Sequence, residues 1–590
     1  MKKISYLDGV RLFRAVKAGC LKIISEQDEL NRINVFPIAD ADTGYNLAYT
    51  CKSIIDKSNL YEKMNKTLSS IAEAAFAGAR GNSGIIFAQF FQGINLEIIK
   101  NRLTTDEFIT ILKKAIQHVY ESMANPVEGT ILTVMREWCE QFEKEVKHSK
   151  DFYTSFLNTF EKAKESLLST KKYLEILAKN DVVDAGALGF VYFLEGIKNF
   201  ILKGEIQKNN LNISLNLKKQ KRLHSVEDIK FRYCTEADLY NTDFNQKQLL
   251  DKLADYGDSI IAGQVRDYFH FHIHTNHPEK IFQDFAPNNT FSAVKVDDMV
   301  VEQKINNNPP EISVIVDSSC DLPEAILDKF NIFRIPLNIY FNDEEYLDKL
   351  TINSQIFYDK INNNSIFPRT SQPSMKNVKK IYDLAIANSK YVIGIHLSAK
   401  LSGTFEQIQA VYSNNENLCI LDSKHLSGSY GLIVYRIVQE LKEYGFQAIK
   451  KRFEKYRENT KILTDIKSLD YLVRGGRVKP LIGKAAKLVN LKPIVSVDKI
   501  GKALLIGKSF TRNGNLKKIL KIFKQDRDNN GIWNYAIVHG NNLRRAKLYA
   551  ELLTDALNKK PLYISEIAPS IAVHNGEGAV AVCYMTKNID

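Results

Sequence analysis

The stretch that decides how the first part of this chain is interpreted is Asn34-Val35-Phe36-Pro37-Ile38-Ala39-Asp40-Ala41-Asp42-Thr43-Gly44-Tyr45-Asn46. Asp40 and Asp42 stand one residue apart, and Thr43 and Gly44 follow them. Two carboxylates in this arrangement can hold a divalent metal against phosphate oxygens. The alternative is that Asp42 and Thr43 only cap the helix that follows, as such residues commonly do.

A second segment favours phosphate chemistry. Gly78-Ala79-Arg80-Gly81-Asn82-Ser83-Gly84 places small residues immediately before an apolar helical pattern that begins at Ile85. Small residues expose backbone N–H groups, and a turn of this kind at the start of a helix can cradle phosphates.

These two segments, together with Asn125-Pro126-Val127-Glu128-Gly129-Thr130 and Asp181-Val182-Val183-Asp184-Ala185-Gly186, resemble the nucleotide-binding domain of the dihydroxyacetone-kinase family, in the variant found in bacterial fatty acid kinases. The resemblance covers about residues 1–200. Ala39 and Ala41 stand where the family usually has Pro and Gly. The resemblance implies ATP and Mg²⁺ as cofactors and catalytic magnesium ligands at Asp40 and Asp42. It also implies nucleotide contacts at Thr43, Gly44, Asn46, Gly81, Asn82, Ser83, Gly84, Thr130, Asp184 and Gly186.

Length and composition indicate a large globular protein. The chain has 590 residues, which at about 150 residues per domain predicts roughly three or four domains. Of these residues 44% are hydrophobic and 25% are charged. The seven cysteines are scattered without a Cys-x-x-Cys pair, which argues against a disulfide framework and for a reducing compartment. No uncharged apolar stretch reaches about 18 residues, so we expect a cytoplasmic protein with neither signal peptide nor membrane span.

The net charge of +13 raises the question of an anionic partner such as nucleic acid or a membrane surface. The sequence shows no recognition helix, zinc finger or aromatic and basic platform, so we expect no nucleic acid partner. Transient contact with a membrane surface is compatible with the charge. The densest basic cluster, residues 218–222, lies in a polar stretch that we interpret as a solvated linker.

Composition changes at two places along the chain. Residues 204–227 are polar and rich in Asn and Lys, and Asn306-Asn307-Asn308-Pro309-Pro310 breaks regular structure. We therefore predict three domains, at residues 1–203, 225–305 and 311–590. Apolar residues recur at helical spacing before residue 203, which predicts an all-α first domain, for which the resemblance implies a helical barrel. We predict that the middle domain is small and α+β.

The middle segment contains a candidate metal site. Phe269-His270-Phe271-His272-Ile273-His274 places three histidines on one face of a strand, and Cys234 adds a thiolate. The alternative is that the histidines are polar residues of an edge strand. The segment also resembles the middle domain of fatty acid kinases, which implies Zn²⁺ ligands at Cys234, His272 and His274, with a structural or dimer-organising role.

After Pro310 short apolar runs alternate with helical patterns, which predicts an α/β domain with ligand loops at the carboxyl ends of parallel strands. Five loops carry hydroxyl, arginine and histidine side chains, a combination that suits a carboxylate. They begin at Asp317, Thr370, Leu401, Tyr471 and His574.

The five loops follow the order found in the DegV family of fatty-acid-binding proteins, which this part resembles over residues 311–590. The resemblance implies a two-subdomain fold in which Thr370 and Ser402 bond a fatty acid carboxylate, with Gly403, Thr404 and His574 nearby and Arg477 presented to the kinase. Glu577 and Ala399 depart from the family pattern. As isolated residues, Ser402 and Thr404 could instead cap a helix, Arg477 could be a surface ion-pair residue, and His574 could be a buried structural histidine.

The two resemblances together predict an ATP-dependent fatty acid kinase with its own acyl carrier, which makes acyl phosphate for phospholipid synthesis and forms a homodimer. A fatty acid carboxylate is ionised at pH 7 and needs no base, which suits motifs that supply only metal ligands and phosphate cradles. One alternative is a kinase for dihydroxyacetone or a related small polyol. Another is a lipid-binding or regulatory protein without enzymatic activity.

Overall fold

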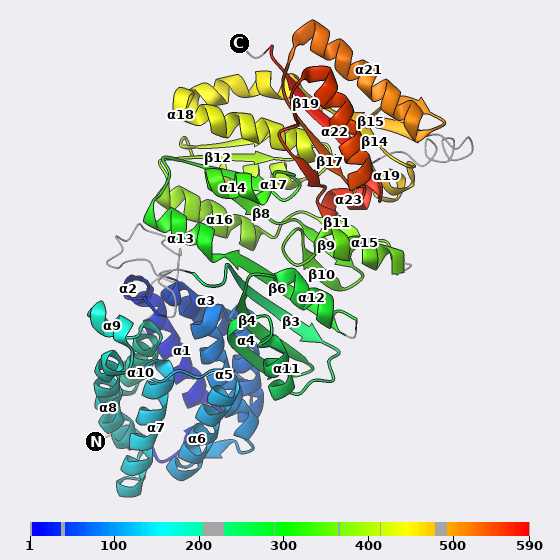
Figure 1. The fold of residues 1–590 in the computed structure, drawn as a ribbon. Helices are drawn as coiled ribbons and strands as arrows, with labels where there is room; N and C mark the ends of the chain where they lie inside the picture. Colours follow the sequence, from blue (N-terminus) through cyan, green and yellow to red (C-terminus); the bar gives the residue numbers. More distant parts are fainter. Residues whose placement is uncertain are drawn as a thin grey trace. The chain divides into compact units, whose positions relative to one another are not determined.

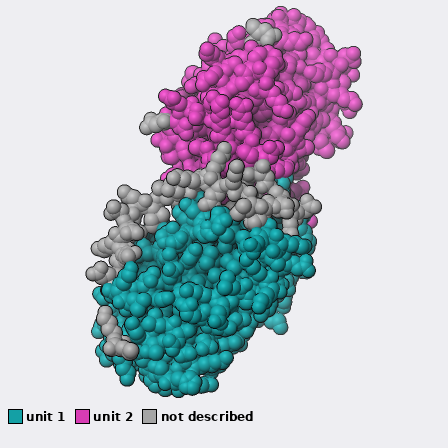
Figure 2. Space-filling model, turned by 90° about the vertical axis from the view of Figure 1, so that its left-hand side faces the viewer, with its two compact units in different colours: residues 1–278, 288–302 teal, residues 279–287, 303–590 magenta. Residues whose placement is uncertain are grey.

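The computed structural model describes residues 3–36, 42–204, 229–287, 289–363, 366–413, 415–477 and 492–588. The chain forms two compact units (Figure 2). Unit 1 contains residues 1–278 and 288–302, and unit 2 contains residues 279–287 and 303–590. The sheet strands of the middle segment therefore fold with the first domain, whereas residues 279–287 group with the C-terminal part. The basic cluster at residues 218–222 lies outside the described residues.

The first domain is helical, as predicted (Figure 1). Its helices are α1 (Gly9–Ser25), α2 (Gln27–Arg32), α3 (Thr43–Lys57), α4 (Met64–Gly78), α5 (Gly81–Glu97), α6 (Thr105–Glu121), α7 (Ile131–His148), α8 (Phe152–Tyr173), α9 (Glu175–Lys179) and α10 (Ala185–Lys203). The one departure is a short antiparallel pair of strands, β1 (Leu7–Asp8) and β2 (Arg102–Leu103).

The helices of this domain pack in a closed ring. Each of α1, α3, α5, α6, α7, α8 and α10 contacts the next, and α10 returns to α1. Apolar positions recur at helical spacing and face a common core. The chain also encodes the helix ends: Thr104 and Glu107 form a reciprocal capping box at the start of α6. By length and composition alone, α10 is the one helix in the described ranges that could cross a membrane. It packs here as a core helix against α1, α7 and α8.

The middle segment forms a four-stranded antiparallel sheet with the order β4-β5-β3-β6. Its elements are β3 (Tyr233–Tyr240), α11 (Gln246–Leu253), β4 (Gly257–Val265), β5 (Tyr268–Thr275), α12 (Pro278–Phe285), β6 (Thr290–Asp298) and α13 (Met299–Asn307). Helix α13 extends through Asn306 and Asn307, so regular structure ends two residues later than the sequence predicted.

The C-terminal part has the predicted α/β architecture, in two subdomains. The first contains a parallel sheet, β13-β12-β7-β8, and a small antiparallel sheet, β10-β9-β11; the second contains a mixed sheet, β16-β15-β14-β19-β17-β18. The strands are β7 (Ile312–Asp317), β8 (Ile332–Ile335), β9 (Asn338–Phe341), β10 (Glu344–Leu347), β11 (Arg369–Ser371), β12 (Tyr391–His396), β13 (Leu418–Asp422), β14 (Thr460–Asp465), β15 (Lys492–Val497), β16 (Ala503–Ser509), β17 (Ile532–His539), β18 (Ile564–Glu566) and β19 (Val580–Thr586).

Helices flank these sheets (Figure 1). They are α14 (Glu324–Phe330), α15 (Ser354–Asn363), α16 (Met375–Asn388), α17 (Thr404–Tyr412), α18 (Ser427–Glu458), α19 (Asp470–Arg474), α21 (Arg512–Asn530), α22 (Leu543–Leu557) and α23 (Pro569–Asn575). All seven cysteines lie in the described part of the chain, each is buried, and none forms a disulfide.

Candidate functional site

Four helices of unit 1 bring their N-termini together. The amide of Asn46 on α3 lies against Gly81 at the start of α5, so that a Cβ added to Gly81 would overlap it. A Cβ added to Gly186 on α10 would lie 3.4 Å from Ser83 Oγ. Asp184 accepts hydrogen bonds from the backbone N–H groups of Ala187, at 2.7 Å, and of Ile131, the first residue of α7. Unpaired N–H groups and helix dipoles make such a meeting point suitable for an anion.

Helix capping accounts for some of the predicted residues but not for all. Thr130 and Asp184 cap α7 and α10 with their side chains. Asp42 occupies the N-cap position of α3, yet its carboxylate makes no capping hydrogen bond. Asp42 therefore caps α3 by position but not through its side chain, and Thr43 begins the helix. Asp40 lies outside the described residues.

Two buried polar groups beside this meeting point of helix N-termini lower the stability of the protein when no ligand is bound. Asp184 is buried, and burial raises its pKa to about 7. Asn82 Oδ1 is also buried and has no hydrogen-bond partner within the described ranges. A buried carboxyl group with a raised pKa and an unsatisfied polar atom in one place are typical of a binding site.

The histidines of the middle sheet form a ladder with acidic and thiol side chains. In the register of β3 and β5, Cys234 faces His274, and Glu236 faces His272. Strand β5 is internal to the sheet, so the interpretation of its histidines as polar residues of an edge strand is wrong.

Three of these side chains fit a zinc ion. One ligand atom from each of Cys234, His272 and His274 lies within 4.8 Å of the others, and all three residues are buried. His272 Nε2 has no hydrogen-bond partner among the described residues. Burial lowers the pKa of His274 to about 3, which keeps its ring neutral and a lone pair available. A Cys and two His supply three of the four ligands of tetrahedral zinc.

Unit 2 contains an apolar cavity of about 510 Å³. Its apolar walls include Leu337, Leu397, Ile462, Val495 and Ile571. Volumes of this order are usual for small-molecule sites with apolar walls and a few polar groups.

Most of the residues predicted from the loops line this cavity, whereas Thr404 is not among its described lining residues. Thr370, Ser402, Gly403, His574 and Arg477 all line it. Thr370 Oγ1 lies 3.4 Å from His574 Nε2, and Ser402 Oγ lies 2.9 Å from Thr404 Oγ1.

Helix capping does not explain Ser402 and Thr404. The N-cap of α17 is Gly403, and no side chain caps this helix, so that interpretation is wrong. Arg477 donates from Nη2 to the carbonyl of Leu401 at 3.0 Å rather than to a carboxylate. Burial, and next the charge of Arg477, lower the pKa of His574 to about 3. The ring is therefore neutral at pH 7.

Family models match the chain in three consecutive segments. A DAK2 domain matches residues 37–199, the FakA-like middle domain of fatty acid kinases matches residues 230–305, and the DegV family, described as uncharacterised, matches residues 311–587. This chain joins a DAK2 domain, a FakA-like middle domain and a DegV domain.

Individual relatives cover parts of it. A DegV domain-containing protein of Clostridium acetobutylicum is 29% identical over 283 residues, which are 47% of this chain and 99% of the relative. An uncharacterized protein of Mycoplasma genitalium is 29% identical over 335 residues, which are 53% of this chain and 59% of that protein, so this chain spans little more than half of its length. A fatty acid binding DegV family protein from Streptococcus agalactiae has a solved structure that is 27% identical, covers 47% of this chain and 99% of its own, and has a TM-score of 0.43.

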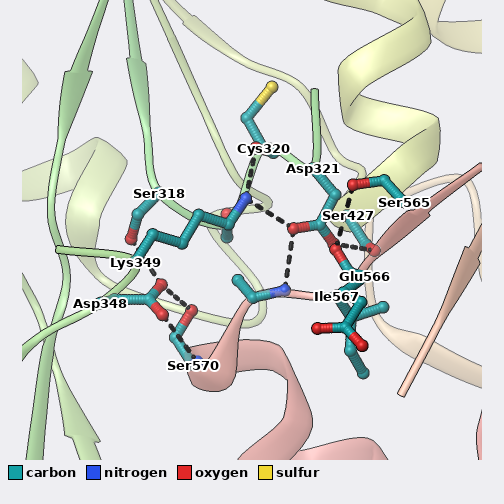
Figure 3. A network of polar contacts seen from close by, with 12 residues as sticks. Ser318, Cys320, Asp321, Asp348, Lys349, Ser427, Ser565, Glu566, Ile567 and Ser570 are labelled. Carbon is teal, nitrogen blue, oxygen red and sulfur yellow. Dashed lines mark hydrogen bonds and ion pairs between the residues drawn. The ribbon is translucent and has the colours of Figure 1, made fainter. Parts of the chain in front are cut away.

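A buried polar network (Figure 3) surrounds the start of α23, the helix that contributes Ser570, Ile571 and His574 to the lining of the DegV-domain cavity. Asp348 accepts hydrogen bonds from Ser318 Oγ at 2.6 Å, from Ser570 Oγ at 2.5 Å and from the Ser570 N–H at 3.1 Å. Asp321 pairs with Lys349 Nζ at 2.8 Å and accepts from the N–H of Ala568. Both carboxylates thus fix the N-terminus of α23, and His574 lies one turn after Ser570 on this helix.

Sequence reasoning missed Asp348, Ser570 and Glu236. Nothing in the local sequence marks the first two, because the fold brings them together from distant positions. A signal for Glu236 did exist: it lies two residues after Cys234 in a strand, so both side chains point to the same face.

Proposed function

We propose that this chain is an ATP-dependent fatty acid kinase whose DegV domain carries the acyl substrate. One observation carries the proposal: a single chain contains both an anion-type site at the helix N-termini of its DAK2 domain and an apolar cavity with hydroxyl and imidazole groups in its lining. The first suits the phosphates of a nucleotide, and the second suits a fatty acid.

In the DAK2 domain, the turn at residues 81–84 would hold phosphate oxygens, and Asp42 would be one ligand of Mg²⁺. The fit is supported by the carboxylate of Asp42, which capping does not use, and by the buried unsatisfied oxygen of Asn82. The metal supplies charge neutralisation on the transferring phosphoryl group when it is bound. Asp40 is expected to act with Asp42. Zinc is proposed at Cys234, His272 and His274.

In the DegV domain, Thr370 and Ser402 would donate hydrogen bonds to the carboxylate, and the apolar walls would enclose the chain. Transfer forms a bond between a carboxylate oxygen and the γ-phosphorus and breaks the bond from that phosphorus to the bridging oxygen, so acyl phosphate and ADP leave. The carboxylate is already ionised at pH 7 and needs no base. Fusion of kinase and carrier raises the effective concentration of substrate to about the millimolar range.

The experiment is mass spectrometry of lipid that co-purifies with the protein, followed by ATP turnover with that lipid and detection of acyl phosphate. Co-purified fatty acid and its ATP-dependent phosphorylation would support the proposal. A polyol phosphate product from dihydroxyacetone would instead support a small-polyol kinase. Lipid binding without any ATP binding would support a carrier or regulatory protein.

A further inference from the structure

The His-bearing face of the middle sheet lies against the start of α5. The backbone N–H of Gly81 donates a hydrogen bond to Glu236 Oε1 at 2.7 Å. Close by, the ring of Phe76 on α4 packs edge-to-face on His270, with 6.2 Å between ring centroids. Both contacts lie inside unit 1.

The same oxygen of Glu236 also faces the Cys/His cluster. Oε1 lies 3.1 Å from Lys295 Nζ, 3.4 Å from His272 Nδ1 and 4.0 Å from Cys234 Sγ. The side chain is 3% exposed. One buried carboxylate oxygen is therefore shared between the turn of the DAK2 domain and two of the three candidate zinc ligands.

The hydrogen bond from the Gly81 N–H to Glu236 affects the conformation of the turn at residues 81–84. Gly81 has a φ of +56°, in the left-handed region, and begins α5. Its N–H is one of the groups at a helix start that have no partner within the helix. When a fixed carboxylate accepts this N–H, the orientation of the turn is set. The Gly84 N–H bonds to the carbonyl of Arg80, so the N–H groups offered to an anion are those of Asn82 and Ser83.

We propose that Glu236 is a positioning residue for the nucleotide site, and that a cation held by Cys234, His272 and His274 sets where its carboxylate lies. This inference rests on the proposed role of residues 81–84 as the phosphate cradle. Coupling between two sites is reciprocal, so nucleotide should strengthen cation retention by the same factor by which the cation strengthens nucleotide binding.

The chain offers a matched control two residues further along β3. Asp238 lies on the same face as Glu236 and pairs with His270 at 2.7 Å, so it is also an acidic partner of a β5 histidine. The Gly81 N–H, however, bonds to Glu236 and not to Asp238.

The test uses the full chain, loaded with Zn²⁺ or stripped by a chelator, with zinc content verified by elemental analysis. Nucleotide affinity is measured with ATP, and hydrogen exchange is measured for the peptide that covers residues 79–84. In the unsubstituted protein, stripping should weaken ATP binding by about tenfold, within the usual range of coupling between sites. In Glu236→Gln this dependence should fall to less than about twofold, and exchange at residues 81–84 should become faster. Asp238→Asn should behave like the unsubstituted protein.

Several outcomes would overturn the inference. These are unchanged exchange at residues 81–84 in Glu236→Gln, the same zinc dependence in Glu236→Gln as in the unsubstituted protein, and no zinc in the unsubstituted protein. Should Glu236→Gln fold poorly, Glu236→Asp is the second variant, because it keeps the charge. It should retain part of the zinc dependence of ATP binding. Complete loss of this dependence in a folded Glu236→Asp protein would contradict the role of the shared carboxylate. If the unsubstituted protein binds no ATP while exchange still accelerates in Glu236→Gln, the proposed function fails and the positioning of the turn stands.

Discussion

Asp184→Asn should stabilise the nucleotide-free DAK2 domain at alkaline pH while removing nucleotide binding. Asp184 is 5% exposed, and burial raises its pKa to about 7 from an ordinary value of 3.8. Folding therefore becomes less favourable as pH rises from 3.8 to about 7, because the unfolded chain ionises first and the folded chain resists ionisation. Asparagine has nearly the same shape and keeps an oxygen for the N–H of Ala187, but it carries no charge.

The magnitude follows from the difference between the folded and unfolded pKa values of Asp184. A difference of one in pKa corresponds to about 1.4 kcal/mol, so the full penalty above pH 7 is on the order of 4 kcal/mol. About three fifths of this penalty develops between pH 5 and pH 8. The advantage of Asp184→Asn in free energy of unfolding should thus grow by about 3 kcal/mol over this interval. A change in hydrogen-bond strength shifts both ends of the interval equally and cancels.

Urea unfolding at pH 5, 6, 7 and 8 measures this growth. The chain has two tryptophans, Trp138 in unit 1 and Trp533 in unit 2. A Trp533→Phe background leaves Trp138, which is buried in the helical core, to report on unit 1 alone. Trp533→Phe without the Asp184 substitution is the control. ATP binding to the same proteins at pH 8 gives the functional readout, and buried charges kept at a cost to stability are typical of functional sites.

Two results would refute this reasoning. An advantage of Asp184→Asn that stays constant from pH 5 to pH 8 would mean that Asp184 titrates in its ordinary range. An Asp184→Asn protein that binds ATP normally would remove Asp184 from the nucleotide site, whatever its stability.

Three further substitutions test the other parts of the proposal. Asp42→Ala should abolish ATP turnover through loss of a metal ligand and leave co-purified fatty acid unchanged; normal turnover would exclude the metal role. Ser402→Ala should remove a charge-assisted hydrogen bond of about 1.5–3 kcal/mol and so weaken fatty acid retention without affecting ATP binding, and full retention by mass spectrometry would contradict it. Asp348→Ala should lower the melting temperature of unit 2, since the hydroxyls of Ser318 and Ser570 lose their acceptor at about 1–3 kcal/mol each, and should also weaken retention. Equal loss of stability in Ser318→Ala would show that the Ser570 contact adds nothing.

The sequence predicted the fold classes, because these depend on local signals. The motif at residues 78–84 predicted a helix from Ile85, and α5 begins four residues earlier, at Gly81. The alternation of His270, His272 and His274 predicted a strand with one polar face, and β5 has it. The assignment of roles to these residues stays a prediction.

Contacts between distant segments could not be predicted in this way. Glu236 meets Gly81 across 155 positions, and Asp348 meets Ser570 across 222. Such pairs depend on how a sheet packs on helices and on where a loop meets the start of a helix. Neither of these produces a repeating pattern of residues in the sequence. The division of the chain into two compact units also depends on contacts between distant segments. The three segments predicted from composition differ in sequence, but the sheet of the middle segment packs with the first domain.

The charge of the His574 ring affects how strongly the cavity would bind a carboxylate. Because burial and the charge of Arg477 hold its pKa near 3, the ring offers a hydrogen bond at pH 7 and no charge. Arg477 directs Nη2 to a backbone carbonyl. Thr370, Ser402 and His574 thus present neutral donors to a carboxylate in this site, and Arg477 is the permanent cation among the described lining residues. This arrangement suits a nucleophile, because strong stabilisation of the bound carboxylate would have to be given up in the transition state, when its charge moves toward the phosphoryl group. Under the proposed function, the Mg²⁺ ion and the N–H groups of the DAK2 domain would neutralise the charge that develops on the phosphoryl group.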